Sequence, residues 1–239
     1  MNHYKKIKFL FAILLPLTFL NAQDNNGMDV FYAIDVSGSY HKEHLTTAVK
    51  LTGDIYDQLT SSDRPVYPQL HTVGVIDEFG LTPDGRCNET YEQQFTSMFL
   101  APTAKKESIF KNECLSNVLK RPQAVNTDMF GAILAAQYTL NYPKKRKALF
   151  IFSDFKDNPM VLFEQNKEQI DLSGIAVVLV WSDTRAKYEG ALSQSLANEF
   201  KSFLKKRGAL RVDSYSLSSL QGLSVVKKLV NDLIKYSKN

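Results

Sequence analysis

Short apolar runs alternate along the chain with longer segments in which apolar residues recur at helical spacing. Continuous apolar runs of this length are typical of strands that are covered on both faces of a sheet. The four clearest are residues 30–34, 70–76, 148–152 and 175–181. Helical apolar stripes follow the first, second and fourth of these runs, as in Leu45, Val49, Ile55 and Leu59. Strands that alternate with helices predict a mostly parallel sheet, because parallel neighbours need a crossover connection.

The remaining segments complete this pattern. Residues 90–98 resemble a short strand that forms a hairpin with the preceding one, since the loop between them is too short for a helical crossover. Further helices are predicted at residues 108–119 and 130–140, along a stripe from Leu192 to Leu204, and at a closing segment that ends near Lys235. Residues 210–215 suit a last edge strand. We therefore expect one α/β domain over residues 27–236, with a doubly wound, mostly parallel sheet, helices on both faces and one antiparallel edge strand.

The first 22 residues follow a different pattern. Lys5, Lys6 and Lys8 precede an apolar run at residues 9–20, and Ala22 offers a small residue for cleavage. This order predicts a secretory signal peptide at residues 1–22. An uncleaved membrane anchor is the alternative, although the run is short for a span and Pro16 interrupts it. We expect an exported protein, periplasmic or secreted, with no membrane span after cleavage.

Export changes how charge and cysteines are interpreted. The first 22 residues hold three of the 29 basic residues and no acidic one, so the rest of the chain has a net charge of +1. A nearly neutral domain has no electrostatic drive toward nucleic acid. Cys87 and Cys114 are the only cysteines of the chain. In an exported protein such a pair predicts a disulfide, with two free thiols as the alternative.

Polar residues gather where the predicted strands end. Asp35, Ser37 and Ser39 follow the first strand, Asp154 follows the strand at 148–152, and Thr127 precedes a helix. Ligands of such sheets bind at the carboxyl ends of the strands, so these side chains should share one rim. Oxygen ligands of this kind suit a hard cation such as Mg2+. Taken singly, the hydroxyl residues could also be helix caps.

The segment Asp35-Val36-Ser37-Gly38-Ser39 resembles the Asp-x-Ser-x-Ser motif of von Willebrand factor type A domains. Thr127 and Asp154 match that family's second-loop threonine and third-loop aspartate. The resemblance covers nearly the whole mature chain and implies a metal-ion-dependent adhesion site for Mg2+ or Mn2+. In such a site the three hydroxyls and two carboxylates hold the ion directly or through water, and a partner's Asp or Glu carboxylate takes the open position.

This sequence departs from the family at Phe155, where glycine is usual. We expect the bulky residue to reshape the rim or to narrow access to it. The loops at residues 77–89 and 182–190 follow strands at the same edge and would select the partner.

These features favour a binding module over an enzyme. No histidine lies within a rim segment, no phosphate-cradling glycine motif appears and no Ser-His-Asp order can be assembled. Two alternatives stay open, a metal-assisted hydrolase of the same fold and a metal-independent scaffold subunit of a cell-envelope assembly. His41 and His44 lack a third ligand and indicate a solvated helix face, whereas His71 is expected to pack within a strand.

Overall fold

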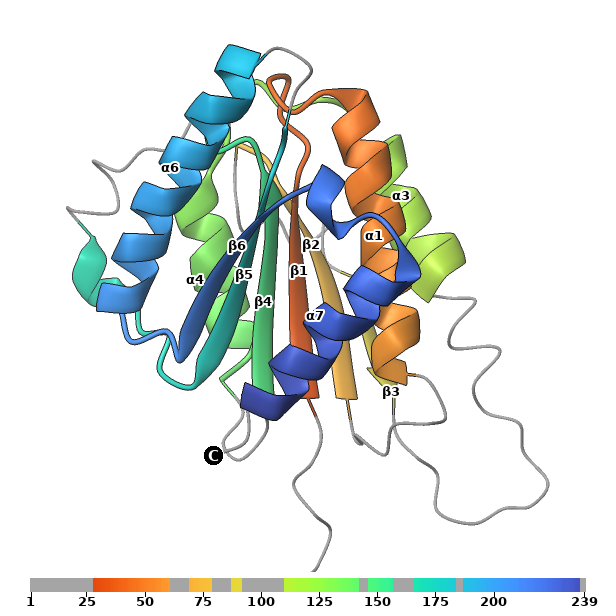
Figure 1. Ribbon diagram of the computed structural model, residues 1–239, viewed down its shortest axis with the longest axis vertical. Coiled ribbons are helices and arrows are strands. Elements are labelled where there is room, and N and C mark those ends of the chain that lie inside the picture. The colour runs from red at the N-terminus through yellow and green to blue at the C-terminus, as the bar shows by residue number, and fades with distance from the viewer. Residues whose placement is uncertain are drawn as a thin grey trace, which may run out of the picture.

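A six-stranded sheet runs through the centre of the protein (Figure 1). The computed structural model describes residues 28–60, 69–78, 87–91, 110–141, 146–156, 166–183 and 187–236, so the predicted signal peptide lies outside it. The strands are β1 (Met28–Asp35), β2 (Gln69–Ile76), β3 (Cys87–Tyr91), β4 (Arg146–Ser153), β5 (Ile175–Trp181) and β6 (Arg211–Ser216). Their order is β3-β2-β1-β4-β5-β6. All neighbours are parallel except β2 and β3, which confirms the predicted sheet with one antiparallel edge strand.

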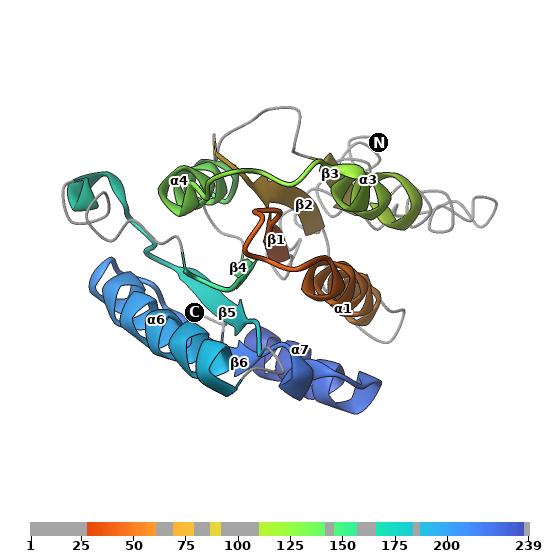
Figure 2. The ribbon, with the colours of Figure 1, turned by 90° about the horizontal axis from the view of Figure 1, so that it is seen from above.

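Helices cover both faces of this sheet, as Figure 2 shows from above. One face carries α1 (Lys42–Thr60), α7 (Leu223–Tyr236) and the continuous pair η3 (Phe110–Leu115) and α3 (Ser116–Lys120). The other carries α4 (Met129–Thr139) and α6 (Lys187–Lys206). Two short 3-10 helices, η4 (Lys167–Gln169) and η5 (Ser218–Leu220), lie in connections. Within the described ranges, no helix is long and apolar enough to cross a membrane.

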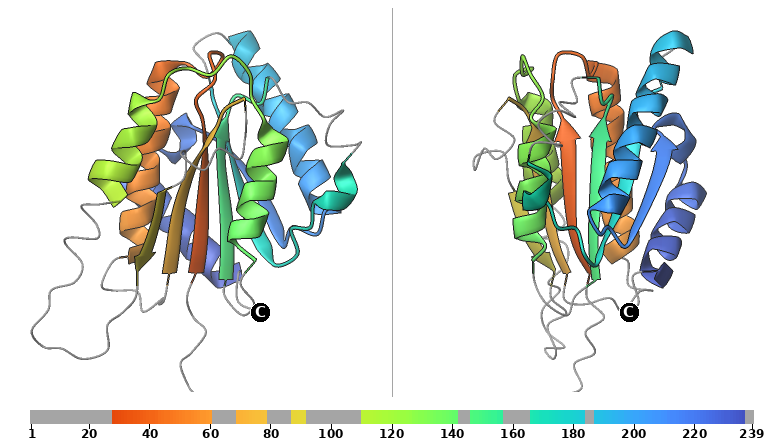
Figure 3. Two further views of the ribbon diagram at one scale, coloured as in Figure 1. Left: turned by 180° about the vertical axis from the view of Figure 1, so that it is seen from behind. Right: turned by 90° about the vertical axis from the view of Figure 1, so that its left-hand side faces the viewer.

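Alternation along the central strands divides the core in two. In β1, Tyr32 and Ile34 pack beneath α1 and α7, whereas Phe31 and Ala33 pack beneath α4 and α6. Successive side chains of a strand point to opposite faces, so the last residue, Asp35, belongs to the α4 and α6 side. The side views in Figure 3 show the parallel strands running toward one edge of the sheet.

Two elements differ from their predicted form. Strand β3 begins at Cys87, ahead of the predicted residues 90–98, and residues 92–98 lie outside the described part. The helix expected at 108–119 starts as the π-helix η3 and continues as α3. Phe110, Cys114 and Leu115 are all buried, and the wider winding of a π-helix keeps residues four and five positions apart on one face.

Candidate metal site at the carboxyl edge of the sheet

Three chain segments meet at the carboxyl edge of the sheet, at the top of Figure 1. Asp35 ends β1, Asp154 directly follows β4, and Thr127 lies two residues before α4. Parallel pairing of β1 with β4 brings the first two together, because Ile34 stands opposite Phe152. The expected convergence of these segments on one rim is therefore present in the backbone.

Backbone hydrogen bonds fix the segment that carries Thr127. Gly38 N donates to Ala124 O (2.9 Å) and Ala124 N donates to Val36 O (3.0 Å), so this segment pairs with the loop after β1. On its other side, Asp128 N donates to Asp77 O (2.7 Å). The Asp128 side chain caps α4 by accepting from Gly131 N at 2.8 Å. Asp128 is therefore the N-cap of α4, so the alternative that Thr127 caps this helix is wrong.

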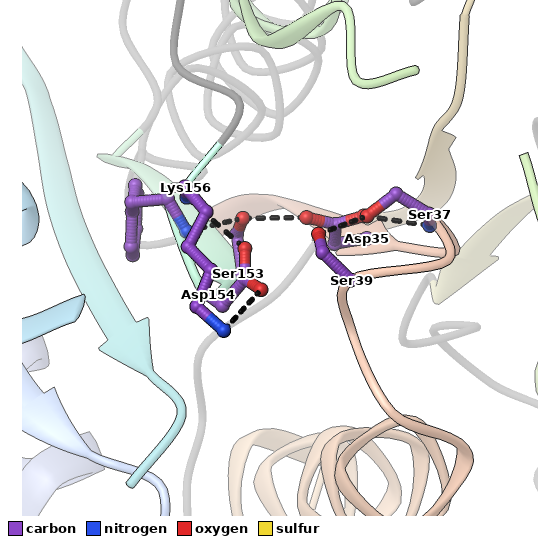
Figure 4. A network of polar contacts seen from close by, with 7 residues as sticks. Asp35, Ser37, Ser39, Ser153, Asp154 and Lys156 are labelled. Atoms are coloured by element: carbon purple, nitrogen blue, oxygen red, sulfur yellow. Dashed lines mark hydrogen bonds and ion pairs between the residues drawn. The ribbon is translucent and has the colours of Figure 1, made fainter. Parts of the chain in front are cut away.

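Asp35 is the centre of a hydrogen-bond network that spans two strands (Figure 4). Its Oδ1 accepts from Ser37 N (2.8 Å) and its Oδ2 accepts from Ser153 Oγ (2.5 Å). The hydroxyls of Ser37 and Ser39 lie 3.1 Å apart. These contacts hold the Asp35 carboxylate against β4 and align the two serine hydroxyls beside it.

The ionisation of Asp35 responds to this environment. Burial raises the pKa of its carboxyl to about 6, and the nearby Asp154 charge adds to the increase. Hydrogen bonds from Ser153 and Ser37 act in the opposite direction, because they stabilise the carboxylate. A cation bound at this edge would favour the ionised form in the same way.

Asp154 and Thr127 carry buried oxygens whose hydrogen-bonding capacity is not used. Asp154 Oδ1 accepts from Lys156 N at 3.1 Å. Its Oδ2 lies 3.7 Å from Lys156 Nζ, too far for a hydrogen bond. Among the described residues, neither Asp154 Oδ2 nor Thr127 Oγ1 has a hydrogen-bond partner. An unmet buried polar group costs about 1–3 kcal/mol, which is a reason to look for a ligand.

Other buried oxygens and nitrogens share this property, and several lie near the same edge. Tyr40 OH, His44 Nδ1 and Ser182 Oγ also lack hydrogen-bond partners within the described part of the chain. Elsewhere in the described part, the hydroxyls of Thr72, Ser193 and Ser214 also lack a hydrogen-bond partner. An unmet hydroxyl alone is therefore not diagnostic, whereas the Thr127 hydroxyl together with an unmet carboxylate oxygen, Asp154 Oδ2, is informative.

The donor set at the rim fits a hard divalent cation. The described residues contain no group of three or more His, Cys, Asp or Glu side chains that could hold a metal. The five predicted residues instead offer two carboxylates and three hydroxyls. Such all-oxygen sets suit Mg2+ or Mn2+, which keep several water ligands. The unmet oxygens of Thr127 and Asp154 are available to such an ion.

Phe155 does not narrow access to the rim, which is one of the two effects expected from its sequence position. Its side chain is 1% exposed and packs against Phe200 of α6, with ring centroids 5.7 Å apart, so it points into the core and away from the rim. Its backbone φ is +58°, which costs a residue with a side chain about 1–2 kcal/mol. Burying a phenylalanine contributes about 1.5–3 kcal/mol, enough to offset that strain.

The histidines divide differently from the prediction. His71 is fully buried in β2, as expected for a residue packed within a strand. His41 is exposed, in keeping with a solvated surface. His44 is only partly exposed, and burial together with nearby His41 lowers the pKa of its imidazole. The solvated helix face predicted for both residues therefore holds for His41 alone.

Ser153 and Lys156 are site residues that sequence reasoning did not identify. Ser153 has the same parity along β4 as Leu149 and Ile151, which face α4 and α6. That parity places it on the side of Asp35, and it is the available signal for the hydrogen bond between them. Lys156 follows Asp154 by two residues, and only the turn between them brings its ammonium group back toward the carboxylate.

The predicted disulfide and partner loops are only partly described. Cys114 is buried in η3, and the described residues contain no free cysteine. The side chain of Cys87 in β3 lies outside the described residues, so its pairing with Cys114 stays a prediction. Of the loops at 77–89 and 182–190, a central part of each also lies outside. Asp183 is held by Ser218, whose backbone N donates to Asp183 Oδ1 at 3.0 Å.

Comparison with known proteins identifies the architecture. No protein-family model and no curated protein sequence matches this chain. Among solved structures, BatB from Bacteroides thetaiotaomicron is similar with a TM-score of 0.53 and 14% identity, over 89% of this chain and 100% of BatB. The open conformation of the pilus adhesin SpaC from Lactobacillus rhamnosus GG gives a TM-score of 0.52 and 8% identity, over 87% of this chain and 30% of SpaC. At such low identity the likeness shows the fold alone, an α/β fold in which helices cover a mostly parallel sheet.

Proposed function

We propose that this chain is an exported binding module, not an enzyme, that holds Mg2+ or Mn2+ at the carboxyl edge of its sheet and thereby binds an acidic group of a protein partner. Asp35, Ser37, Ser39, Thr127 and Asp154 would hold the ion. The observation that carries the proposal is a pair of buried oxygens that have no hydrogen-bond partner among the described residues, Thr127 Oγ1 and Asp154 Oδ2. They lie on the two chain segments that approach the Asp35 loop from either side. When bound, the ion supplies an electrophilic position for a carboxylate.

The residues around the rim have defined roles in this proposal. Ser153 and the Ser37 backbone N hold Asp35 in one orientation, so its carboxylate is preorganised. The hydroxyls of Ser37, Ser39 and Thr127 carry no charge, so the two aspartates provide the negative charge of the set. That limited neutralisation favours an additional acidic group from outside. The fold shared with a pilus adhesin supports a role in binding.

A second candidate function follows from Lys156. Its ammonium group lies 3.7 Å from Asp154 Oδ2 and already places a positive charge beside the carboxylate. An internal cation of this kind favours a scaffold that keeps the rim without metal. The two candidates predict opposite responses to divalent cations and to chelation.

Two buried aspartates of β1 provide a matched test. Asp35→Asn removes one charge at the rim, whereas Asp29→Asn makes the same change at the opposite end of the strand, where Asp29 Oδ1 accepts from Leu70 N at 3.0 Å. Calorimetric titration with Mn2+ should give one site in the wild type and in Asp29→Asn. Binding to Asp35→Asn should weaken at least a hundredfold, which corresponds to about 2.7 kcal/mol.

Partner binding is tested with the same three proteins immobilised in Mg2+ or in chelator. The proposal expects a partner that is retained in Mg2+ by the wild type and Asp29→Asn and is released by chelator. Equal Mn2+ affinity in wild type and Asp35→Asn would contradict it. Capture that ignores both chelation and Asp35→Asn would favour the metal-independent scaffold.

A further inference from the structure

We infer that Phe155 is a positioning residue for the rim, whose buried ring holds the turn that presents Asp154 and Ser153. The inference rests on the proposed metal site but uses contacts that exist without the ion. It concerns a position where the related domains usually have glycine, so it is a feature of this chain.

The backbone of Phe155 is in a conformation that a bulky residue adopts only under constraint. Its φ is +58°, and the other positive φ values in the described structure are at glycines. Strained residues of this kind persist where the surrounding structure enforces them, and they cluster at functional sites. Something must therefore hold Phe155 in place.

The constraint is the core between the sheet and helices α4 and α6. The Phe155 ring is almost completely buried there and lies against Phe200. Because the ring is directed inward, the chain must turn sharply between Asp154 and Lys156. A glycine would allow the same turn but would not be held in it, since glycine is free to adopt many other backbone conformations.

Hydrogen bonds connect this turn to the predicted metal ligands (Figure 4). Phe155 N donates to Ser153 Oγ (3.0 Å), and Ser153 Oγ donates in turn to Asp35 Oδ2 (2.5 Å). Lys156 N donates to Asp154 Oδ1 at 3.1 Å. The turn at residue 155 thus positions Asp154 through the Lys156 amide and Asp35 through Ser153. A displaced ring would misplace both carboxylates.

The test compares Phe155→Gly with Phe155→Leu and with Phe203→Ala. Leucine keeps an apolar anchor, and Phe203→Ala removes another ring of the same core cluster, one that stacks on Phe200. Two quantities are measured, the dissociation constant for Mn2+ and the hydrogen-exchange rate of the Lys156 amide in metal-free protein. We expect Phe155→Gly to weaken Mn2+ binding at least tenfold and to accelerate exchange at Lys156 at least tenfold. Phe155→Leu should stay within threefold of wild type in both, and Phe203→Ala should lower thermal stability without changing either.

The inference is overturned if Phe155→Gly binds Mn2+ and protects the Lys156 amide as the wild type does, or if Phe203→Ala changes both quantities as much. Wild-type protein that binds no Mn2+ would contradict the proposed function, and the exchange rates would still decide the role of Phe155. If Phe155→Gly does not fold, Phe200→Leu loosens the same contact from the other side. Faster Lys156 exchange in Phe200→Leu supports the inference, and unchanged exchange overturns it.

Discussion

Buried polar groups gather in two regions of this protein, and their surroundings differ. In the interior, the Tyr32 hydroxyl and His71 Nδ1 lie 3.2 Å apart. The rings of Tyr56, Phe110 and Phe150 pack around this pair. At the rim, Ser37, Ser153 and Asp35 form hydrogen bonds with one another. Two further oxygens, Thr127 Oγ1 and Asp154 Oδ2, have no hydrogen-bond partner among the described residues. The Tyr32 hydroxyl and the His71 imidazole bond to each other among packed aromatic rings, whereas the rim still has oxygens that can accept a ligand.

Burial changes ionisation in both regions, and it favours the neutral form each time. It lowers the pKa of His71 to about 3 and raises that of Asp35 to about 6. His71 is therefore neutral at physiological pH, while Asp35 is largely ionised and able to bind a cation. Burial and a shifted pKa alone do not identify a functional site. Unmet hydroxyls occur in both regions, and the rim differs from the interior because it adds an unmet carboxylate oxygen, Asp154 Oδ2, near the Asp35 carboxylate.

The largest expected effect on stability comes from the interior region. His71 is neutral when folded but becomes protonated in the unfolded chain as pH falls below 6.5, so stability is lost on acidification. Between pH 7.5 and pH 5 this loss is about 2 kcal/mol. We expect His71→Phe to be less stable at pH 7.5, because the buried Tyr32 hydroxyl loses its hydrogen bond with His71, but to lose about 2 kcal/mol less than wild type on going to pH 5. Urea unfolding at the two pH values measures this difference.

The comparison for His71 is His41→Gln, at the exposed residue just before α1. Because His41 lowers the pKa of the partly buried His44, this variant should change the dependence of stability on pH, but by much less than His71→Phe does. If His71→Phe loses as much stability as wild type at pH 5, the interior histidine is not the source of acid sensitivity.

A pair of threonines tests the rim against the interior directly. Thr127 and Thr72 are both buried, and in the described structure both hydroxyls lack a hydrogen-bond partner. Valine has the same shape, so either substitution should leave stability unchanged or slightly increased. Thr127→Val should weaken Mn2+ binding about tenfold, or about 1.4 kcal/mol, while Thr72→Val should not affect it. Calorimetry measures the affinity. Equal effects of the two variants would remove the distinction between the regions.

The smallest effect is expected at Lys156. Replacing it with methionine removes the ammonium group that lies near Asp154 Oδ2 and would repel a bound cation. Mn2+ affinity should rise about threefold, which corresponds to about 0.7 kcal/mol. Lys111→Met is the control, because Lys111 pairs with Asp57 on α1, at 2.5 Å. Unchanged or weaker binding in Lys156→Met would show that the lysine does not oppose the ion.

Much of the fold was predictable because its elements leave strong local patterns. The apolar runs of β1, β4 and β5 and the apolar stripe along α1 can be recognised without knowing the rest of the fold, because such surfaces are buried in any compact structure. The positions of Asp35 and Asp154 followed from the rule that strand ends converge in a parallel sheet. The prediction that Phe155 affects access to the rim was wrong, because its direction depends on Phe200 in a helix that comes later in the chain. The Ser153 bond to Asp35 likewise depends on the register of β1 and β4.

The central claim is that the rim oxygens bind a divalent cation, and diffraction with Mn2+ tests it most directly. Crystals of the wild-type protein grown with MnCl2 should show one anomalous peak at the carboxyl edge of the sheet, in contact with the hydroxyls of Ser37 and Ser39. Asp154 should then have turned from Lys156 toward the ion or its water. A map without a peak at this edge, in which the Lys156 ammonium stays beside Asp154, would contradict the claim.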